Sequence, residues 1–361
     1  MIDIDGSYLE GGGQIVRTAL ALSTITGKAF RIRNIRKGRK NSGLKAQHVH
    51  AIKALEKLCN AEVTGGDLGS FEVEYIPGKL QSKSVKIDIG TAGSVTLLLQ
   101  SLWLPLLFGD KLVRVRVRGG TNTWWSMPVE YLQHVFLPFL RPLAREVEVA
   151  VLRRGYFPKG GGEIEVKVRP RFSVNDYDSF EAFWEDVRTS GLNFTRKEQG
   201  TLQMIQGLAH ASSDLASRHV AERIAQGAKQ VLAPRALTRI RVEYADTLST
   251  GTGITLWARY SHADDVMPQV VLGADRLGEL NVPAHEVGLR AARELVAAMD
   301  SGAAVDAHAA DNLIPLMALL CPSTILVQNV TSHTRTNIYV CEKFLSSRFT
   351  IEGEMISSKF G

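Results

Sequence analysis

A histidine among hydroxyl residues is the most reactive candidate near the carboxyl end of the chain. His333 lies in the run SHTRTN (332–337), between an expected strand and the expected final helix. A neutral imidazole at a helix N-terminus can attack an electrophilic phosphorus. An N-cap loop with an incidental histidine is the alternative that this run alone leaves open.

Glycines precede the first expected helix in a pattern that suits an anionic ligand. The run EGGGQ spans Glu10 to Gln14, and Arg17 follows one turn later. Three glycines let the backbone approach a ligand closely, and a helix N-terminus favours phosphate. A plain tight turn is an equally good interpretation. The similar run RGYFPKGGGE (154–163) is better explained as a turn between two strands.

A cationic loop joins an expected strand to the next helix. Its sequence is RKGRKNSGL, from Arg36 to Leu44, and Gln47 and His48 follow on the helix. Arg36 and Arg39 could grip phosphate with paired hydrogen bonds. A lone histidine such as His48 is more often a structural residue.

Several common motifs are missing from the sequence. No GxxxxGK[ST] loop, strand–helix GxGxxG, HExxH or GxSxG occurs. The cysteines at positions 59, 321 and 341 are scattered, which predicts neither a disulfide framework nor a zinc site. A nucleotide site in this chain would therefore be of an unusual type.

The composition is that of a globular chain. Its 361 residues predict two domains, and 45% hydrophobic with 22% charged residues excludes a disordered or fibrous chain. The most apolar run, 95–108, is too short to span a membrane and predicts a buried helix. The acidic N-terminus lacks a signal pattern. We therefore expect an intracellular protein that does not enter the membrane.

The net charge of +6 is distributed unevenly. Basic stretches cover 28–45, 111–118 and 141–159, whereas 176–186 is acidic. Such clusters are either solvated faces or sites for phosphate-rich partners. The alternation in KLVRVRVR (111–118) predicts a strand with one cationic, solvated face.

One order of elements recurs three times: a glycine- or alanine-rich turn, a helix, a strand, a second helix and a strand. The copies contain the helical runs QIVRTALALSTI, SVTLLLQSLWLPLLF and HAADNLIPLMALL. Each copy predicts a four-stranded sheet with two helices on one face, so the fold class is α+β.

The third copy begins much later than the spacing of the first two predicts, which indicates an inserted domain. A helix around SRHVAERIAQGAKQVLA and the strands TRIRVEYA and GITLWARYS indicate a smaller α+β insertion. We expect a three-repeat catalytic core over residues 1–184 and 280–361, and the inserted domain over 185–279.

Six segments, in order, resemble the RNA 3′-terminal phosphate cyclase family along nearly the whole chain. They are IDGSYLEGGGQIVRTALALS, IRKGRKNSGLKAQH, GTAGSVTLLLQ, RGYFPKGGGEIEV, AADNLIPLMAL and SHTRTNI. The resemblance implies the same three repeats with an insertion. It also implies an ATP-dependent enzyme of the ligase class that acts on RNA with a 3′-phosphate end. Such an enzyme forms a 2′,3′-cyclic phosphate through a covalent histidine–AMP intermediate, and releases pyrophosphate and AMP.

The resemblance also implies roles for individual residues. It places the nucleophile at His333 and a ligand for Mg²⁺ or Mn²⁺ at Glu10. It assigns the ATP-binding positions to Arg17, Arg36, Arg39, Gln47, His48, Gln100, Pro128, Tyr131, His308, Asp311 and Asn312. Asn312 stands where bacterial relatives have glutamine, and His308 stands where an aromatic residue flanks the base.

Three other functions are alternatives to this one. A catalytically inert cyclase-like factor of ribosome biogenesis shares the fold, but that branch lacks the histidine found here at 333. An enolpyruvyl-transferase-like enzyme has similar repeats, but SHTRTN and EGGGQ do not suit it. A plain RNA-binding module leaves the nucleotide-site residues unexplained. A nuclear location is expected if the chain is eukaryotic, and a cytoplasmic one otherwise.

Overall fold

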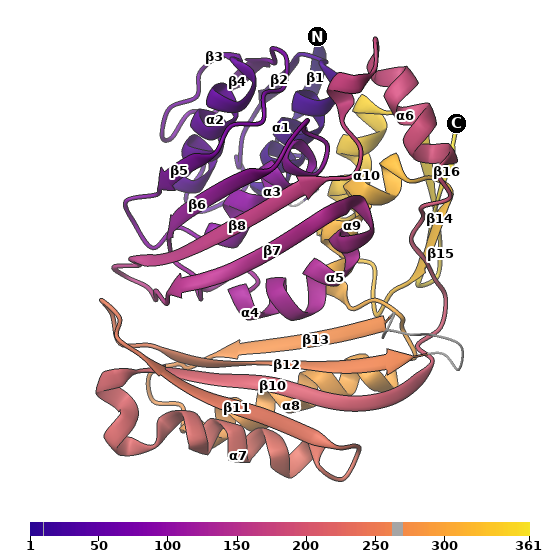
Figure 1. The fold of residues 1–361 in the computed structure, drawn as a ribbon. Coiled ribbons are helices and arrows are strands. Elements are labelled where there is room, and N and C mark those ends of the chain that lie inside the picture. The colour runs from indigo at the N-terminus through magenta and orange to yellow at the C-terminus, as the bar shows by residue number, and fades with distance from the viewer. Residues whose placement is uncertain (10, 262–269) are drawn as a thin grey trace.

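The computed structural model describes residues 1–9, 11–261 and 270–361. In this part of the chain, four four-stranded sheets are covered by helices (Figure 1). Three of the sheets form the core, and the fourth belongs to the insertion.

The first two repeats follow one another along the chain. The first repeat consists of β1 (Ile2–Asp5), α1 (Gln14–Thr26), β2 (Phe30–Arg33), α2 (Ala46–Cys59), β3 (Glu62–Thr64) and β4 (Val73–Ile76). The second consists of β5 (Val85–Asp88), α3 (Val95–Leu107), β6 (Val113–Gly119), α4 (Val129–Tyr131), a π-helical turn (Leu132–Phe136), α5 (Leu137–Leu140), a 3₁₀ turn (Arg141–Leu143), β7 (Ala144–Arg153) and β8 (Gly162–Pro170). Prolines at 138 and 142 interrupt the second helix of this repeat, because proline lacks the backbone donor that a continuous helix needs.

The insertion interrupts the third repeat after its first strand. The linking elements are a 3₁₀ turn (Val174–Asp176) and α6 (Phe180–Thr189). The third repeat consists of β9 (Thr195–Arg196), α9 (Ala307–Leu319), β14 (Ser323–Leu326), α10 (Ser332–Phe344), β15 (Ser347–Glu352) and β16 (Met355–Phe360). The insertion holds β10 (Thr201–Ser212), a 3₁₀ turn (Ser213–Arg218), α7 (Val220–Leu232), β11 (Thr238–Ala245), β12 (Thr252–Ser261), β13 (Val270–Leu277) and α8 (Ala284–Asp300).

The strand order confirms the predicted α+β fold of three repeats. The core sheets run β1-β2-β4-β3, β5-β6-β8-β7 and β9-β14-β16-β15. In each sheet the first two strands are parallel, and the third and fourth form an antiparallel pair beside them. The inserted sheet has the order β11-β10-β12-β13.

The hydrophobic core explains how the layers pack. One cluster of buried side chains joins the three repeats, with α3 among its members because nearly every residue of VTLLLQSLWLPLL is apolar. A second cluster lies in the insertion, between its sheet and helices α7 and α8. In Figure 1 these two helices cover the lower face of the inserted sheet, and α4 and α5 of the core lie above its other face.

Two elements lie on the other side of the expected domain boundaries. Helix α8 was expected in the core, but its buried residues belong to the second cluster. Strand β9 was expected in the insertion, but it pairs with β14 in a core sheet. Tertiary packing decides to which domain each element belongs. Helix α8 buries its apolar face against the inserted sheet, and β9 completes the sheet of the third repeat.

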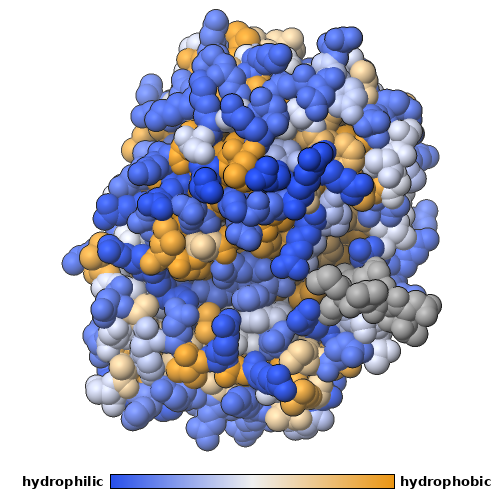
Figure 2. Space-filling model, viewed as in Figure 1, coloured by the Kyte–Doolittle hydropathy of each residue, from blue (hydrophilic) through white to orange (hydrophobic). Residues whose placement is uncertain are grey.

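The cationic strand predicted from KLVRVRVR forms β6, with its valines buried and its arginines on the open face. Two of these arginines form ion pairs with acidic residues on neighbouring strands. Arg116 pairs with Glu165 at 2.9 Å, and Arg118 lies 3.4 Å from Asp88. This stretch therefore makes a mixed surface. On the face shown in Figure 2, hydrophilic residues predominate and hydrophobic ones form separate small patches.

Candidate active site

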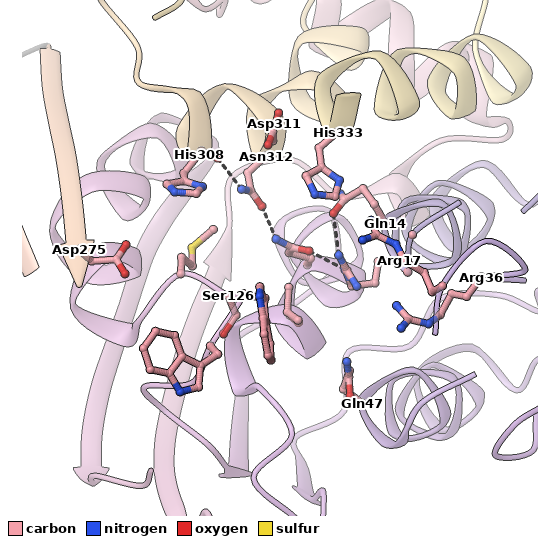
Figure 3. A pocket seen from close by; sticks show the side chains of 18 residues that line it. Gln14, Arg17, Arg36, Gln47, Ser126, Asp275, His308, Asp311, Asn312 and His333 are labelled. Atoms are coloured by element: carbon pink, nitrogen blue, oxygen red, sulfur yellow. Dashed lines mark hydrogen bonds between the residues drawn. The ribbon is translucent and has the colours of Figure 1, made fainter. Parts of the chain in front are cut away.

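A cavity of about 710 Å³ lies where the three repeats meet the insertion. Helices α1, α2, α3, α9 and α10 each contribute residues to it, together with three loops and one residue of β13. Nine of the predicted site residues line it: Arg17, Arg36, Arg39, Gln47, Gln100, His308, Asp311, Asn312 and His333. The fold thus gathers residues spread over more than three hundred positions (Figure 3).

Helix N-termini face this cavity. Helix α10 begins after Thr331, whose hydroxyl accepts a hydrogen bond from the Thr334 amide at 3.0 Å, and His333 is the second residue of the helix. Helix α1 begins directly after Gly13. Because backbone N–H groups are unpaired at a helix start and the helix dipole is positive there, both ends favour an anion.

Gly12 and Gly13 have little or no room for a larger side chain, because other residues occupy the space beside them. A Cβ added to Gly13 would lie 2.3 Å from Nε2 of His48, which only glycine avoids. A Cβ on Gly12 would lie 3.5 Å from Nη2 of Arg39 and 3.8 Å from Cε1 of His333. The loop backbone therefore lies directly beside both the candidate nucleophile and a cationic side chain.

His48 lies behind the cavity wall and supports it. Its Nδ1 accepts a hydrogen bond from the Lys45 amide at 3.0 Å, and its Nε2 lies 3.4 Å from Nη1 of Arg17. Burial lowers the pKa of His48 well below its usual value, and the nearby charges of Arg17 and Arg36 lower it further. His48 is thus a neutral support for Arg17, as a structural histidine would be.

Arg17 is the centre of a hydrogen-bonded chain that crosses three helices. Its Nη2 donates to Oε1 of Gln14 at 2.7 Å, and its Nε donates to Oε1 of Gln100 at 2.6 Å. The Gln100 amide then donates to Oδ1 of Asn312 at 2.7 Å, and the Asn312 amide donates to the carbonyl of His308 at 2.7 Å. Figure 3 shows this chain along the cavity wall.

The positive charge of Arg17 is buried without an anionic partner among the described residues. The residue is 6% exposed, and its hydrogen-bond partners are the neutral groups named above. Burial lowers the pKa of Arg17 to about 9, and the nearby Arg36 adds to this effect. A buried cation is costly unless an anion accompanies it. A negatively charged ligand in the cavity would therefore compensate the buried charge of Arg17.

Asp311 joins α9 to the first turn of α10, which carries His333. One carboxylate oxygen accepts hydrogen bonds from the hydroxyls of Thr331 at 2.5 Å and Thr334 at 2.6 Å. These two threonines flank the dipeptide Ser332-His333. Burial raises the pKa of Asp311, although the two hydroxyls and the nearby histidines oppose this effect. The start of α10 is thus held rigidly against the cavity.

Three predicted nucleotide-binding residues do not line the cavity. His48 supports it from behind, and Pro128 is the residue before α4. Tyr131 is fully buried and donates a hydrogen bond to Asp306, which caps α9. Both amide atoms of Asn312 are engaged within the protein, as described above, so contact with a base would require this amide to exchange partners.

Six cavity-lining residues lie outside both the predicted site residues and the predicted glycine loop: Leu97, Trp124, Trp125, Ser126, Met127 and Asp275. Leu97 belongs to α3, the next four lie in the loop after β6, and Asp275 lies on β13 of the insertion. The tryptophan pair was the only available signal in the sequence, since nothing in the local pattern around Asp275 distinguishes it from a surface aspartate.

The expected metal ligand cannot be placed, because Glu10 lies outside the described residues. Among the residues that are described, no group of three or more histidine, cysteine, aspartate or glutamate side chains could hold a metal ion. None of the described helices combines the length and the apolar character of a membrane span.

The fold and the cavity bring cationic side chains and two helix starts beside a histidine, an arrangement typical of proteins that bind phosphorylated ligands. A family profile described as RNA 3′-terminal phosphate cyclase matches residues 8–351. The chain therefore belongs to the RNA 3′-terminal phosphate cyclase family.

Similar proteins of known sequence carry the same name. The RNA 3′-terminal phosphate cyclase of Methanosarcina acetivorans is 42% identical, covering 98% of this chain and 97% of its own. That of Pyrococcus abyssi is 41% identical, covering 98% and 96%. That of Archaeoglobus fulgidus is 41% identical, covering 99% and 100%. These relatives are archaeal, which gives no support to a nuclear location.

Proposed function

We propose that this protein converts an RNA 3′-terminal phosphate to a 2′,3′-cyclic phosphate at the expense of ATP. The observation that carries the proposal is the buried guanidinium of Arg17, which has only neutral partners among the described residues and lies in one cavity with His333. Such a site favours a polyanion held against a nucleophile.

The proposed reaction has three steps. A ring nitrogen of His333 attacks the α-phosphorus of ATP, and the bond from that phosphorus to the bridging oxygen breaks, releasing pyrophosphate. An oxygen of the RNA 3′-phosphate then attacks the same phosphorus, and the phosphorus–nitrogen bond breaks. Finally the adjacent 2′-hydroxyl attacks the activated 3′-phosphate, loses its proton and expels AMP. Only RNA has the 2′-hydroxyl that the last step requires.

The residues of this chain have separate roles in the proposal. Arg17, Arg36 and Arg39 bind the phosphates and stabilise the negative charge that develops during transfer. Asp311 and the hydroxyls bonded to it hold His333 in position. The exposed ring of His308 is available for contact with the adenine base.

The proposal includes a divalent cation, Mg²⁺ or Mn²⁺, with Glu10 as its ligand. Bound there, it would neutralise charge on the departing pyrophosphate. No other step depends on it. A cytoplasmic location is proposed on the strength of the archaeal relatives.

The test uses two short RNAs that end in a 3′-phosphate and differ only in the terminal 2′ position. With ATP, the 2′-hydroxyl RNA should give a cyclic phosphate together with one AMP and one pyrophosphate per end. The 2′-deoxy RNA should accumulate as the adenylylated end, because it cannot close the ring. If neither RNA is changed and no pyrophosphate appears, the protein is an inert member of the family and the proposal is wrong.

A further inference from the structure

Two neighbouring tryptophans stand on the rim of the cavity. Trp125 is 95% exposed and Trp124 is 39% exposed, yet both line the same cavity as His333 and the arginines. Ser126, which follows them, is among the residues around the cavity in Figure 3. Large aromatic side chains are seldom left in water, and exposed ones commonly mark a binding surface.

The backbone at this point is held in an unusual conformation. Trp125 has a φ of +60°, in the left-handed region that bulky residues rarely adopt. Strain of this kind persists when the surrounding structure enforces it, and it is concentrated at functional sites.

The residues on both sides of the pair are firmly anchored. The Thr121 amide donates to the Gly155 carbonyl at 3.0 Å, and the Thr96 hydroxyl donates to the Met127 carbonyl at 2.7 Å. Within the loop, the Ser126 hydroxyl donates to the Thr123 carbonyl at 3.1 Å. The indole of Trp125 is therefore presented to solvent by a fixed loop.

The chemistry of the site identifies what would cover this indole. A small ligand enclosed by the cavity would leave a side chain that is 95% exposed largely in water. A polymer whose end enters the cavity, in contrast, carries its preceding units across the rim. In a nucleic acid those units present flat bases, which stack on aromatic side chains regardless of sequence.

We propose that Trp125, assisted by Trp124, stacks against the nucleobase that precedes the 3′-terminal nucleotide of the RNA. This inference rests on the proposed function, since it takes RNA to be the polymer whose end reaches His333. The platform recognises the chain behind the reacting phosphate, so it discriminates an oligonucleotide from a mononucleotide.

The test compares two substrates in the full-length protein. One is a ten-nucleotide RNA with a 3′-phosphate, and the other is a nucleoside 3′-monophosphate, which has no preceding base. Trp125→Ala is expected to lower kcat/KM for the oligonucleotide by about 5- to 150-fold more than for the mononucleotide, the range that one stacked base provides. Trp125→Phe should restore most of the loss, because it keeps an aromatic face. Leu280→Ala, which removes a side chain that is 92% exposed and outside the cavity, should change neither.

Other outcomes would overturn the inference. An equal loss for both substrates would mean general damage to the cavity, and a loss of adenylylation by ATP alone would place the indole on the ATP base. If the wild type proves inert, fluorescence titration with the same 3′-phosphorylated RNA still decides the matter, because stacking predicts weaker binding to Trp125→Ala. Failure of the proposed function would abolish turnover in the wild type, whereas failure of the stacking inference would leave wild-type turnover intact and binding unaffected by the substitution.

Discussion

Replacing Arg17 by glutamine is expected to stabilise the ligand-free protein and to remove its response to polyphosphates. In the native fold the Arg17 guanidinium is 6% exposed and has only neutral hydrogen-bond partners among the described residues. Glutamine is shorter and uncharged, so the substitution removes the buried charge together with those hydrogen bonds.

The magnitude follows from the pKa of Arg17. Burial lowers it from 12.5 to about 9. At about 1.4 kcal/mol for each pH unit, holding this charge costs the fold up to about 5 kcal/mol. The cost is present in full below pH 9, where the group is charged in both states, and it disappears as the pH rises from about 9 to 12.5. Losing the hydrogen bonds costs about 1 kcal/mol each, which leaves a net gain of roughly 1–3 kcal/mol.

The assay is urea unfolding at pH 7.5, with and without ATP. Ligand-free Arg17→Gln should unfold at higher urea concentration than the wild type, and the added ligand should stabilise only the wild type. Arg118→Gln is the matched control, because its side chain is 49% exposed and its pairing with Asp88 is weak. A destabilised Arg17→Gln variant that is still stabilised by ATP would show that the Arg17 charge neither strains the ligand-free fold nor binds the polyphosphate.

Two further predictions concern buried carboxylates. Glu130→Gln should lower the free energy of unfolding at pH 7 by about 3–5 kcal/mol, because Arg154 would lose its fully buried partner. Burial raises the pKa of Glu130, but Arg154 outweighs this and lowers it to about 2, so the pair stabilises the wild type above about pH 4.5 and the benefit is lost as the pH falls toward 2. A loss below 1 kcal/mol in urea unfolding would contradict this assignment. Burial also raises the pKa of Asp275 to about 7, with nearby carboxylates adding to the rise and His308 opposing it. Above that pH the Asp275 carboxyl is ionised and repels the phosphates of ATP in the cavity. The KM for ATP should therefore rise from pH 6.5 to 8.5 in the wild type and stay constant in Asp275→Asn. Identical pH profiles for the two proteins would exclude an effect of Asp275 on ATP binding.

The sequence predicted the order of elements and most of the cavity. Periodicity identified the helices of each repeat and the alternating strand β6, because both patterns depend only on neighbouring residues. The family resemblance identified the arginines and His333, and the fold brings them together.

Features that depend on tertiary packing were not predictable. Arg154 looked like part of a basic surface, but it is buried in a network with Glu130 and Glu243. An amphipathic helix such as α8 has the same pattern whichever sheet it covers. Strand β9 has two residues and gives almost no signal. The exposure of Trp125 depends on the anchoring of its loop by segments far away in the sequence.

The proposed role of His333 is tested by covalent labelling with ATP that carries a radioactive α-phosphate. The wild type should acquire acid-labile label with release of pyrophosphate, and peptide mapping should locate AMP on His333. His333→Ala should acquire none while unfolding at the same urea concentration, and His219→Ala, which alters a side chain that is 75% exposed, should label like the wild type. Label retained in a folded His333→Ala variant would mean that another residue is the nucleophile.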